Sequence, residues 1–157
     1  MAIQVGQVAP DFNLRDTDKN YVRLSELKGK NVVLLFFPLA FTGVCTKELC
    51  SVRDNIGAYN NTNATVFGIS VDSLFSLGKF RTEQNLNFQL LSDFNKEAST
   101  AFESIYETFL NDMKGVSKRS AFVIDAAGVV QYAEVLENAG EVPNFEAIQQ
   151  CLQQLNA

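Results

Sequence analysis

The sequence contains no histidine and no tryptophan among its 157 residues, and it has only three cysteines. The lack of histidine excludes Ser-His-Asp and Cys-His catalysis and every histidine-ligated metal site. Two neighbouring cysteines and one distant cysteine are too few for a four-thiolate zinc site or for a disulfide framework. We therefore expect no bound metal or cofactor, and we expect the chain to work in a reducing cytoplasm.

Positive charge is also scarce. Thirteen lysine and arginine residues stand against eighteen acidic residues, which gives a formal net charge of −5. A chain of this sign is not expected to bind nucleic acid or an anionic membrane surface. No basic start followed by an apolar core marks a signal peptide, and the longest apolar run, Val32–Phe41, is too short to span a bilayer.

Length and composition favour a single domain over residues 1–157, with 46% apolar residues. The hydrophobic pattern predicts hairpins over 12–24 and 120–135, strands over 32–37, 65–71 and 88–91, and helices after Thr42, after Asp72 or Ser73, over 96–106 and after Asn144. Segment 107–118 is expected to be a loop. This order predicts an α/β fold, a three-layer sandwich around a central mixed sheet with an N-terminal hairpin.

The most informative stretch runs from Val32 to Cys50. Its apolar start is typical of a strand buried on both faces, and Pro38 ends that strand because proline cannot donate to a sheet ladder. Thr42 is a candidate N-cap, which places Cys45 at the third helical position. A helix N-terminus stabilises a thiolate, so we expect Cys45 to ionise more readily than a free cysteine. On these grounds alone, a buried core cysteine is an equally good interpretation.

The segment 38–45, PLAFTGVC, has the pattern Pro-x-x-x-Thr-x-x-Cys and resembles the active site of the peroxiredoxins. Val8–Phe12 is similar to the usual start of that family, and Arg119–Gly128 is similar to its later arginine and strand-turn block. The three blocks occur in the family's order over nearly the whole chain. The wording Phe-Thr-Gly-Val-Cys is most similar to alkyl hydroperoxide reductase E, and the resemblance implies a thioredoxin-like fold.

The resemblance implies a thiol-dependent peroxidase for hydrogen peroxide and organic hydroperoxides. Cys45 would attack the peroxide and become a sulfenic acid, while Thr42 would hold the peroxide through its hydroxyl and Pro38 would shield the thiolate. Arg119 would stabilise the thiolate and the charge on the leaving oxygen, and Glu48 would position Arg119 through a bidentate pair. Taken singly, these residues also fit structural roles, as a cap, a strand end, a surface charge and a solvated helix residue.

Cys50 departs from the reductase E pattern. Its spacing from Cys45 resembles peroxiredoxin Q, in which a second cysteine resolves the sulfenic acid. Five residues of helix separate two Cα atoms by roughly 8–9 Å, beyond the roughly 7 Å limit for a disulfide. We therefore expect the helix to unwind after Cys45 is oxidised. The alternative is that Cys50 has no redox role, and no role is expected for Cys151.

The implied partners are thioredoxin or another thiol reductant and a second copy of the chain. Apolar residues near the active-site loop and on the following helix are expected to form the homodimer surface: Leu39, Phe41, Phe75, Leu77 and Phe80. Two other functions stay open, a one-cysteine peroxidase resolved by an external thiol and a non-catalytic redox sensor or scaffold. A thioredoxin-type oxidoreductase requires Cys-x-x-Cys at the helix start, which Val44–Cys50 lacks.

Overall fold

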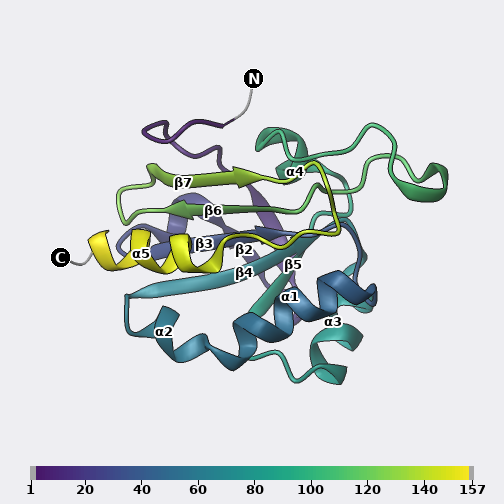
Figure 1. Ribbon diagram of the computed structural model, residues 1–157, viewed down its shortest axis with the longest axis horizontal. Coiled ribbons are helices and arrows are strands. Elements are labelled where there is room, and N and C mark those ends of the chain that lie inside the picture. Colours follow the sequence, from purple (N-terminus) through teal and green to yellow (C-terminus); the bar gives the residue numbers. More distant parts are fainter. Residues whose placement is uncertain (1–2, 156–157) are drawn as a thin grey trace.

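The computed structural model describes residues 3–155, and within them seven strands form one mixed sheet in the order β2-β1-β5-β4-β3-β6-β7. The strands are β1 (Asn13–Asp16), β2 (Tyr21–Arg23), β3 (Asn31–Phe36), β4 (Ala64–Ser70), β5 (Gln89–Ser92), β6 (Ser120–Ile124) and β7 (Val130–Val135). The helices are α1 (Gly43–Asp54), α2 (Ile56–Asn60), α3 (Leu74–Glu83), α4 (Glu97–Ala101) and α5 (Phe145–Leu155), with 3-10 turns η1 (Leu24–Leu27) and η2 (Leu110–Asp112). Figure 1 shows the sheet through the middle of the molecule.

Strand β3 lies near the centre of the sheet, and all its residues are buried. It pairs in parallel with β4 and antiparallel with β6, which confirms the predicted mixed sheet. The buried strand expected over 32–37 is confirmed to within one residue. The predicted N-terminal hairpin is also confirmed, because β1 pairs antiparallel with β2 and extends the sheet through β5.

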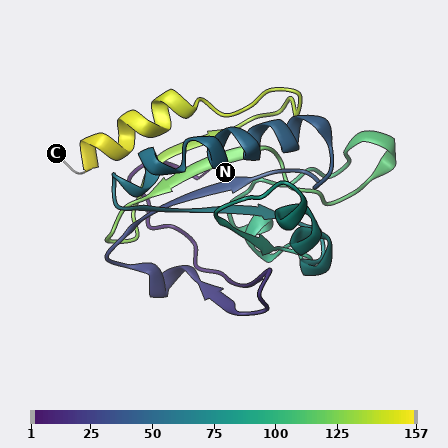
Figure 2. The ribbon, with the colours of Figure 1, turned by 90° about the horizontal axis from the view of Figure 1, so that it is seen from below.

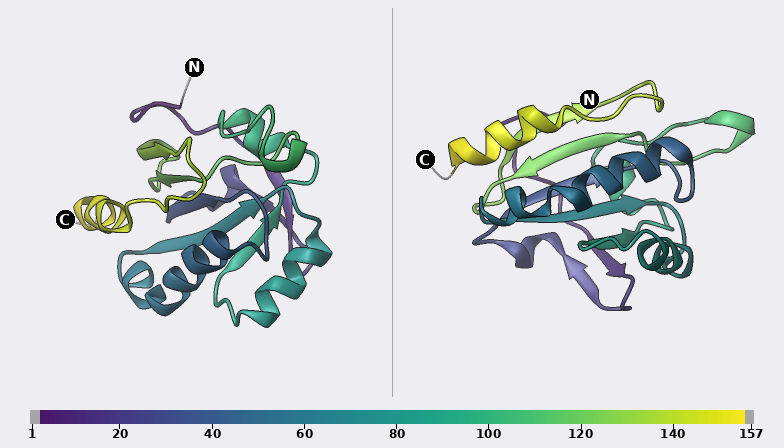
Figure 3. Two further views of the ribbon diagram at one scale, coloured as in Figure 1. Left: turned by 45° about the vertical axis from the view of Figure 1, so that its right-hand side comes forward. Right: turned by 60° about the horizontal axis from the view of Figure 1, so that its bottom comes forward.

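Each face of the sheet carries its own hydrophobic core. Val33 and Leu35 of β3 contribute to one core with side chains from α1, α2, α3 and α5. Leu34 and Phe36 contribute to the other, with α4 and the N-terminal segment. Successive side chains of a strand point to opposite faces, so a strand covered on both sides is apolar throughout. Figures 2 and 3 show α1, α3 and α5 on one face and α4 on the other.

The predicted helix starts are confirmed at two side-chain caps. Ser73 Oγ accepts a hydrogen bond from the Ser76 N–H, and Asn144 Oδ1 accepts one from the Ala147 N–H. The predicted helix after Thr42 begins where expected, and it is interrupted between α1 and α2. None of the helices within residues 3–155 is long and apolar enough to cross a bilayer.

The helix expected over 96–106 is wrong in length, because α4 has only five residues. Phe102 ends it by packing its buried ring against other phenylalanine rings, and Glu103 then adopts a left-handed φ of 53°. The chain next buries Ser104, whose hydroxyl lies 2.6 Å from Ser120 Oγ. Tertiary contacts with β6 therefore outweigh the helical propensity of this segment.

The loop expected over 107–118 forms a narrow arm, which we define as residues 106–116. It projects beyond the end of the sheet, beside the start of α1, and is green in Figure 1. Backbone hydrogen bonds between Tyr106 and its partners Val116 and Gly115 close its base. Asn111, inside η2, has a left-handed φ of 58°. The arm thus places a short, sharply turned segment over the N-terminus of α1.

Candidate active site

Cys45 occupies the third position of α1, as predicted, and is fully buried. Its sulfur-bearing side chain contributes to the wall of a cavity of about 320 Å³, which lies between the loop before α1 and the arm. Apolar residues from both segments line this cavity: Pro38, Leu39, Val44, Phe109, Leu110 and Met113. A reagent in this cavity therefore lies beside Cys45 in a small, largely apolar space.

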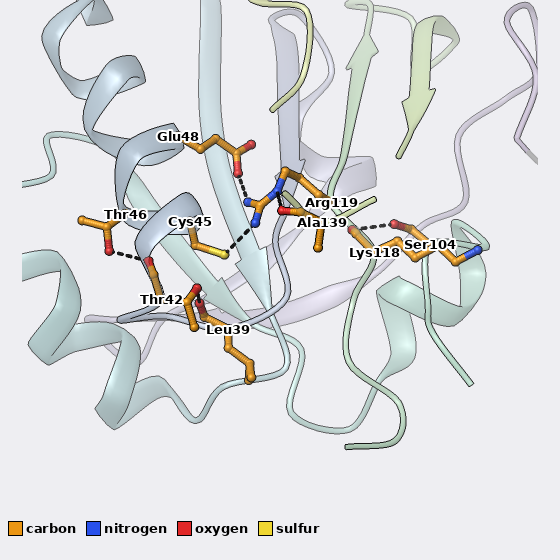
Figure 4. Close-up of polar contacts among 9 residues, drawn as sticks. All are labelled: Leu39, Thr42, Cys45, Thr46, Glu48, Ser104, Lys118, Arg119 and Ala139. Atoms are coloured by element: carbon orange, nitrogen blue, oxygen red, sulfur yellow. Dashed lines mark hydrogen bonds and ion pairs between the residues drawn. The ribbon is translucent and has the colours of Figure 1, made fainter. Parts of the chain in front are cut away.

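Arg119 stands immediately before β6 and is only 2% exposed. Figure 4 shows its guanidinium between two side chains of α1. Nη2 donates to Cys45 Sγ at 3.2 Å, Nη1 donates to Glu48 Oε1 at 2.7 Å, and Nε donates to the carbonyl of Ala139 at 3.0 Å. Burial disfavours the charged form of the guanidinium, but the interactions with Glu48 and Cys45 are stronger than this effect and raise the pKa of Arg119. The guanidinium is therefore a fixed, buried cation directed at the sulfur.

Glu48 is buried and pairs with Arg119, but the expected bidentate pair is wrong. Only Oε1 meets the guanidinium, because Nη2 is directed at Cys45 instead. Oε2 is buried without a hydrogen-bond partner among residues 3–155. Burial raises the pKa of Glu48 to about 7, although the charge of Arg119 opposes this shift. One cation thus serves two groups that can each carry a negative charge.

Thr42 is the N-cap residue of α1 by backbone geometry, but its side chain makes no capping hydrogen bond. The hydroxyl instead donates to the carbonyl of Leu39 at 2.8 Å. Phe41, with a left-handed φ of 69°, turns the loop back toward that carbonyl. Thr42 and the buried Pro38 nevertheless line the same cavity as Cys45.

Cys50 lies further along α1 and is half-buried. Its thiol is 3.5 Å from Gln84 Oε1, and the helix between Cys45 and Cys50 is continuous. Cys151 lies on α5, with its sulfur 3.7 Å from the carbonyl of Gln131, and burial raises the pKa of its thiol. All three cysteines are free. The structure thus brings Arg119 to Cys45 but leaves the other two sulfurs elsewhere.

The predicted dimer surface needs correction at two positions. Leu77 and Phe80 are fully buried in the core, because they form the inner face of α3. Phe41 and Phe75 are 52% and 71% exposed, and Leu39 is partly buried at the cavity. Only these outer residues remain available to a partner.

Two features of the site were missed from the sequence. The carbonyl of Ala139 holds Arg119 Nε, but a backbone acceptor has no signature in a sequence. The apolar residues of the arm lie in a segment without periodicity, which gave no sign that it reaches the cavity. Within residues 3–155, no cluster of three or more acidic or cysteine side chains is arranged to hold a metal ion.

The AhpC/TSA family matches residues 5–133 of this chain. The chain belongs to this family, the peroxiredoxins. Alkyl hydroperoxide reductase E of Mycobacterium tuberculosis H37Rv is 39% identical over 141 residues, covering 89% of this chain and 90% of the relative. Peroxiredoxin Bcp of Bacillus subtilis 168 is 38% identical over 130 residues, covering 82% of each chain. The family resemblance inferred from the three sequence blocks is therefore confirmed.

Solved peroxiredoxin structures also share this fold. The crystal structure of peroxidoxin BcpB from Mycobacterium tuberculosis has a TM-score of 0.81 and 30% identity, covering 98% of this chain and 97% of that one. The crystal structure of a peroxiredoxin Q mutant from Xylella fastidiosa has a TM-score of 0.88 at 24% identity, covering 100% of this chain and 99% of that one. The thioredoxin-like fold is therefore confirmed.

Proposed function

We propose that this peroxiredoxin reduces hydrogen peroxide and organic hydroperoxides, with Cys45 as the attacking sulfur. The observation that carries the proposal is the 3.2 Å contact between Arg119 Nη2 and Cys45 Sγ at the cavity wall. A buried cation and the positive end of α1 both favour the thiolate, which is the nucleophilic form of cysteine. The apolar lining supports organic hydroperoxides as substrates beside hydrogen peroxide.

In the first step, the thiolate attacks the terminal oxygen of the peroxide. The O–O bond breaks, Cys45 takes the terminal OH and becomes a sulfenic acid, and the leaving oxygen takes a proton from solvent and departs as water or alcohol. Arg119 stabilises the charge that develops on the leaving oxygen. The Thr42 hydroxyl both donates and accepts, so it can turn from the Leu39 carbonyl to the peroxide. Pro38 offers an apolar wall without an N–H group.

In the second step, Cys50 resolves the sulfenic acid by forming a disulfide with Cys45. This needs local unwinding of α1, because the intact helix keeps the two cysteines apart. Thioredoxin or another thiol then reduces the disulfide. This need for thiol reductant supports a place in the reducing cytoplasm. The seven strands within residues 3–155 form one sheet, which supports a single peroxiredoxin domain.

The exposed rings of Phe41 and Phe75 support a homodimer formed beside the cavity. Phe41 packs its ring against the buried ring of Phe80 at 5.1 Å, so one side of it is held by the core while the other faces solvent. Sedimentation of the parent and of Phe75→Glu at micromolar concentration tests this surface. A dimer in the parent and a monomer in the variant are expected, and a monomeric parent contradicts the proposal.

Peroxide consumption with a thioredoxin reducing system tests the peroxidase function. Cys45→Ser is expected to abolish turnover, Cys50→Ser to stop it with thioredoxin, and Cys151→Ser, the matched control, to leave it unchanged. Turnover of Cys50→Ser at the parent's rate with an external thiol indicates the one-cysteine peroxidase instead. An inactive parent with every peroxide and thiol tried indicates the non-catalytic sensor or scaffold.

A further inference from the structure

The C-terminal half of α1 is fastened to the turn that follows α3. Arg53 Nη1 donates to the carbonyl of Gln84 at 2.6 Å, and Asn87 Nδ2 donates to the carbonyl of Arg53 at 3.1 Å. The side chain of Gln84 accepts from the Cys50 thiol at 3.5 Å. We call Arg53, Gln84 and Asn87 the clasp. Gln84 thus holds α1 twice, through its backbone at Arg53 and through its side chain at Cys50.

The clasp rests on rigid surroundings. Gln84 is the C-cap of α3, and its N–H bonds back to the carbonyl of Phe80, whose ring is fully buried. The chain turns sharply at Asn85, with a left-handed φ of 52°, and buries Leu86. The backbone of Gln84, which supplies the acceptor for Arg53 and carries the side chain that accepts from Cys50, is therefore anchored by the end of α3 and the core beneath it.

The N-terminal half of α1 is held differently. The hydroxyls of Thr42 and Thr46 make hydrogen bonds within the loop and the first turn. The long-range hydrogen bonds of this half come from Arg119 to Cys45 and Glu48. Oxidation removes the negative charge of the Cys45 thiolate and so weakens one of these two contacts. The clasp at the other half is untouched by that oxidation.

We propose that the clasp controls how quickly Cys50 leaves its place on α1 to resolve oxidised Cys45. This proposal rests on the peroxidase function proposed above. The Cys50 sulfur must leave Gln84 Oε1 before it attacks the sulfur of the Cys45 sulfenic acid. The new S–S bond replaces the S–O bond, and the departing hydroxide leaves as water with the proton of the Cys50 thiol. Unwinding beyond Cys50 must also break the Arg53 contact with Gln84.

The clasp then sets the lifetime of the sulfenic acid. While Cys50 is held, a second peroxide can oxidise the Cys45 sulfenic acid to sulfinic acid and leave as water or alcohol. A tighter clasp therefore favours overoxidation, and a looser clasp favours the disulfide. Gln84 and Arg53 act through Cys50 and touch no reacting oxygen, so they are positioning residues.

Rapid-quench mass spectrometry after one equivalent of hydrogen peroxide tests the clasp. Gln84→Met removes the acceptor for Cys50 but keeps the backbone carbonyl, and Arg53→Met removes the charged donor. We expect disulfide formation about threefold faster in Gln84→Met and about tenfold faster in Arg53→Met, the ratios that a lost neutral and a lost charged hydrogen bond allow. Glu83→Met, an exposed neighbour at the end of α3, is the matched control and is expected to match the parent.

A second readout separates this inference from the peroxidase function. The rate at which Cys45 first reacts with peroxide is expected to stay the same in all four proteins, while the sulfinic acid formed per turnover falls in the two clasp variants. Unchanged or slower disulfide formation in both variants overturns the clasp, as does a parent that forms no Cys45–Cys50 disulfide while consuming peroxide. A parent whose Cys45 does not react with peroxide instead overturns the peroxidase function.

Discussion

Arg119 reaches the sulfur of Cys45 across 74 positions of sequence, at 3.2 Å. The register of the sheet makes this contact possible. Phe36, the last residue of β3, pairs with Ser120, the first residue of β6. Because the two strands are antiparallel, the chain leaves β3 at the same end of the strands at which it enters β6. Arg119 therefore stands beside the loop that leads to Cys45.

Replacement of Arg119 tests how far this cation activates Cys45. Arg119→Met is expected to slow the reaction of Cys45 with peroxide about 100-fold or more, as for loss of a preorganised charge donor. Stopped-flow kinetics with hydrogen peroxide measure this effect. Arg119→Lys keeps the charge but cannot serve three acceptors in one plane, so it is expected to recover only part of the rate.

Glu48 gives the fold a distinctive pH dependence. Its pKa is raised from the ordinary 4.5 to about 7 by burial, so the folded chain holds a proton that the unfolded chain has lost. The stability contributed by Glu48 is thus complete below about pH 4.5 and is lost as the pH rises through about 7.

Glu48→Gln removes this ionisation while keeping an oxygen for Arg119. Urea unfolding is expected to show the variant gaining about 2 kcal/mol relative to the parent between pH 5 and pH 8, since one pKa unit is worth about 1.4 kcal/mol. Glu83→Gln, at an exposed site, serves as the control and is expected to show no such trend. An equal difference at both pH values contradicts the prediction and means that Arg119 keeps Glu48 ionised throughout.

Asn138 is expected to support catalysis from outside the cavity. Its Oδ1 accepts from the Gly140 N–H at 2.9 Å, and this turn presents the Ala139 carbonyl to Arg119. Asn138→Ala is expected to slow the reaction of Cys45 with peroxide by about 2- to 10-fold, the ratio for one neutral hydrogen bond. Asn138→Asp keeps the acceptor and is expected to restore the rate. Equal rates in the parent and in Asn138→Ala mean that the turn does not position the guanidinium.

Replacement of Ser104 and Ser120 tests the contact that holds the segment after α4 against β6. Their hydroxyls lie 2.6 Å apart in the core, and Ser104 also donates to the carbonyl of Lys118. Ser104→Ala is expected to lower the free energy of unfolding by about 1–3 kcal/mol, because Ser120 then keeps a buried hydroxyl without this partner. The double alanine variant is expected to lose less than the sum of the single variants, in a thermal or urea unfolding cycle. Simple additivity contradicts a direct pair.

The elements predicted well from the sequence are those with a strong local signal. The run after Asn31 is apolar on both faces, so β3 lies where expected. Asn144 is a polar capping residue followed by a hydrophobic stripe, so α5 also begins where expected. The start of α1 and the position of Cys45 follow from Pro38 and the residues after it in the same way.

The predictions are wrong where the position of a residue depends on a contact with residues far away in the sequence. Phe102 and Ser104 leave the helical pattern because they meet β3 and β6, and no periodicity within 96–106 shows that. The Thr42 hydroxyl turns away from its expected capping role because the loop curls at Phe41. Glu48 makes a single contact with Arg119 because Nη2 donates to Cys45 Sγ instead, an arrangement that only the folded chain supplies.

The order of the strands has a consequence for synthesis of the protein. A nascent chain that has emerged as far as α3 already contains Cys45 and Glu48, but Arg119 is still unmade. Until β6 inserts beside β3, Cys45 lacks its cation and Glu48 has no counterion. The thiol therefore gains its contact with Arg119 only when β6 has joined the sheet, so Cys45 of an incomplete chain is expected to react with peroxide more slowly than Cys45 of the folded protein.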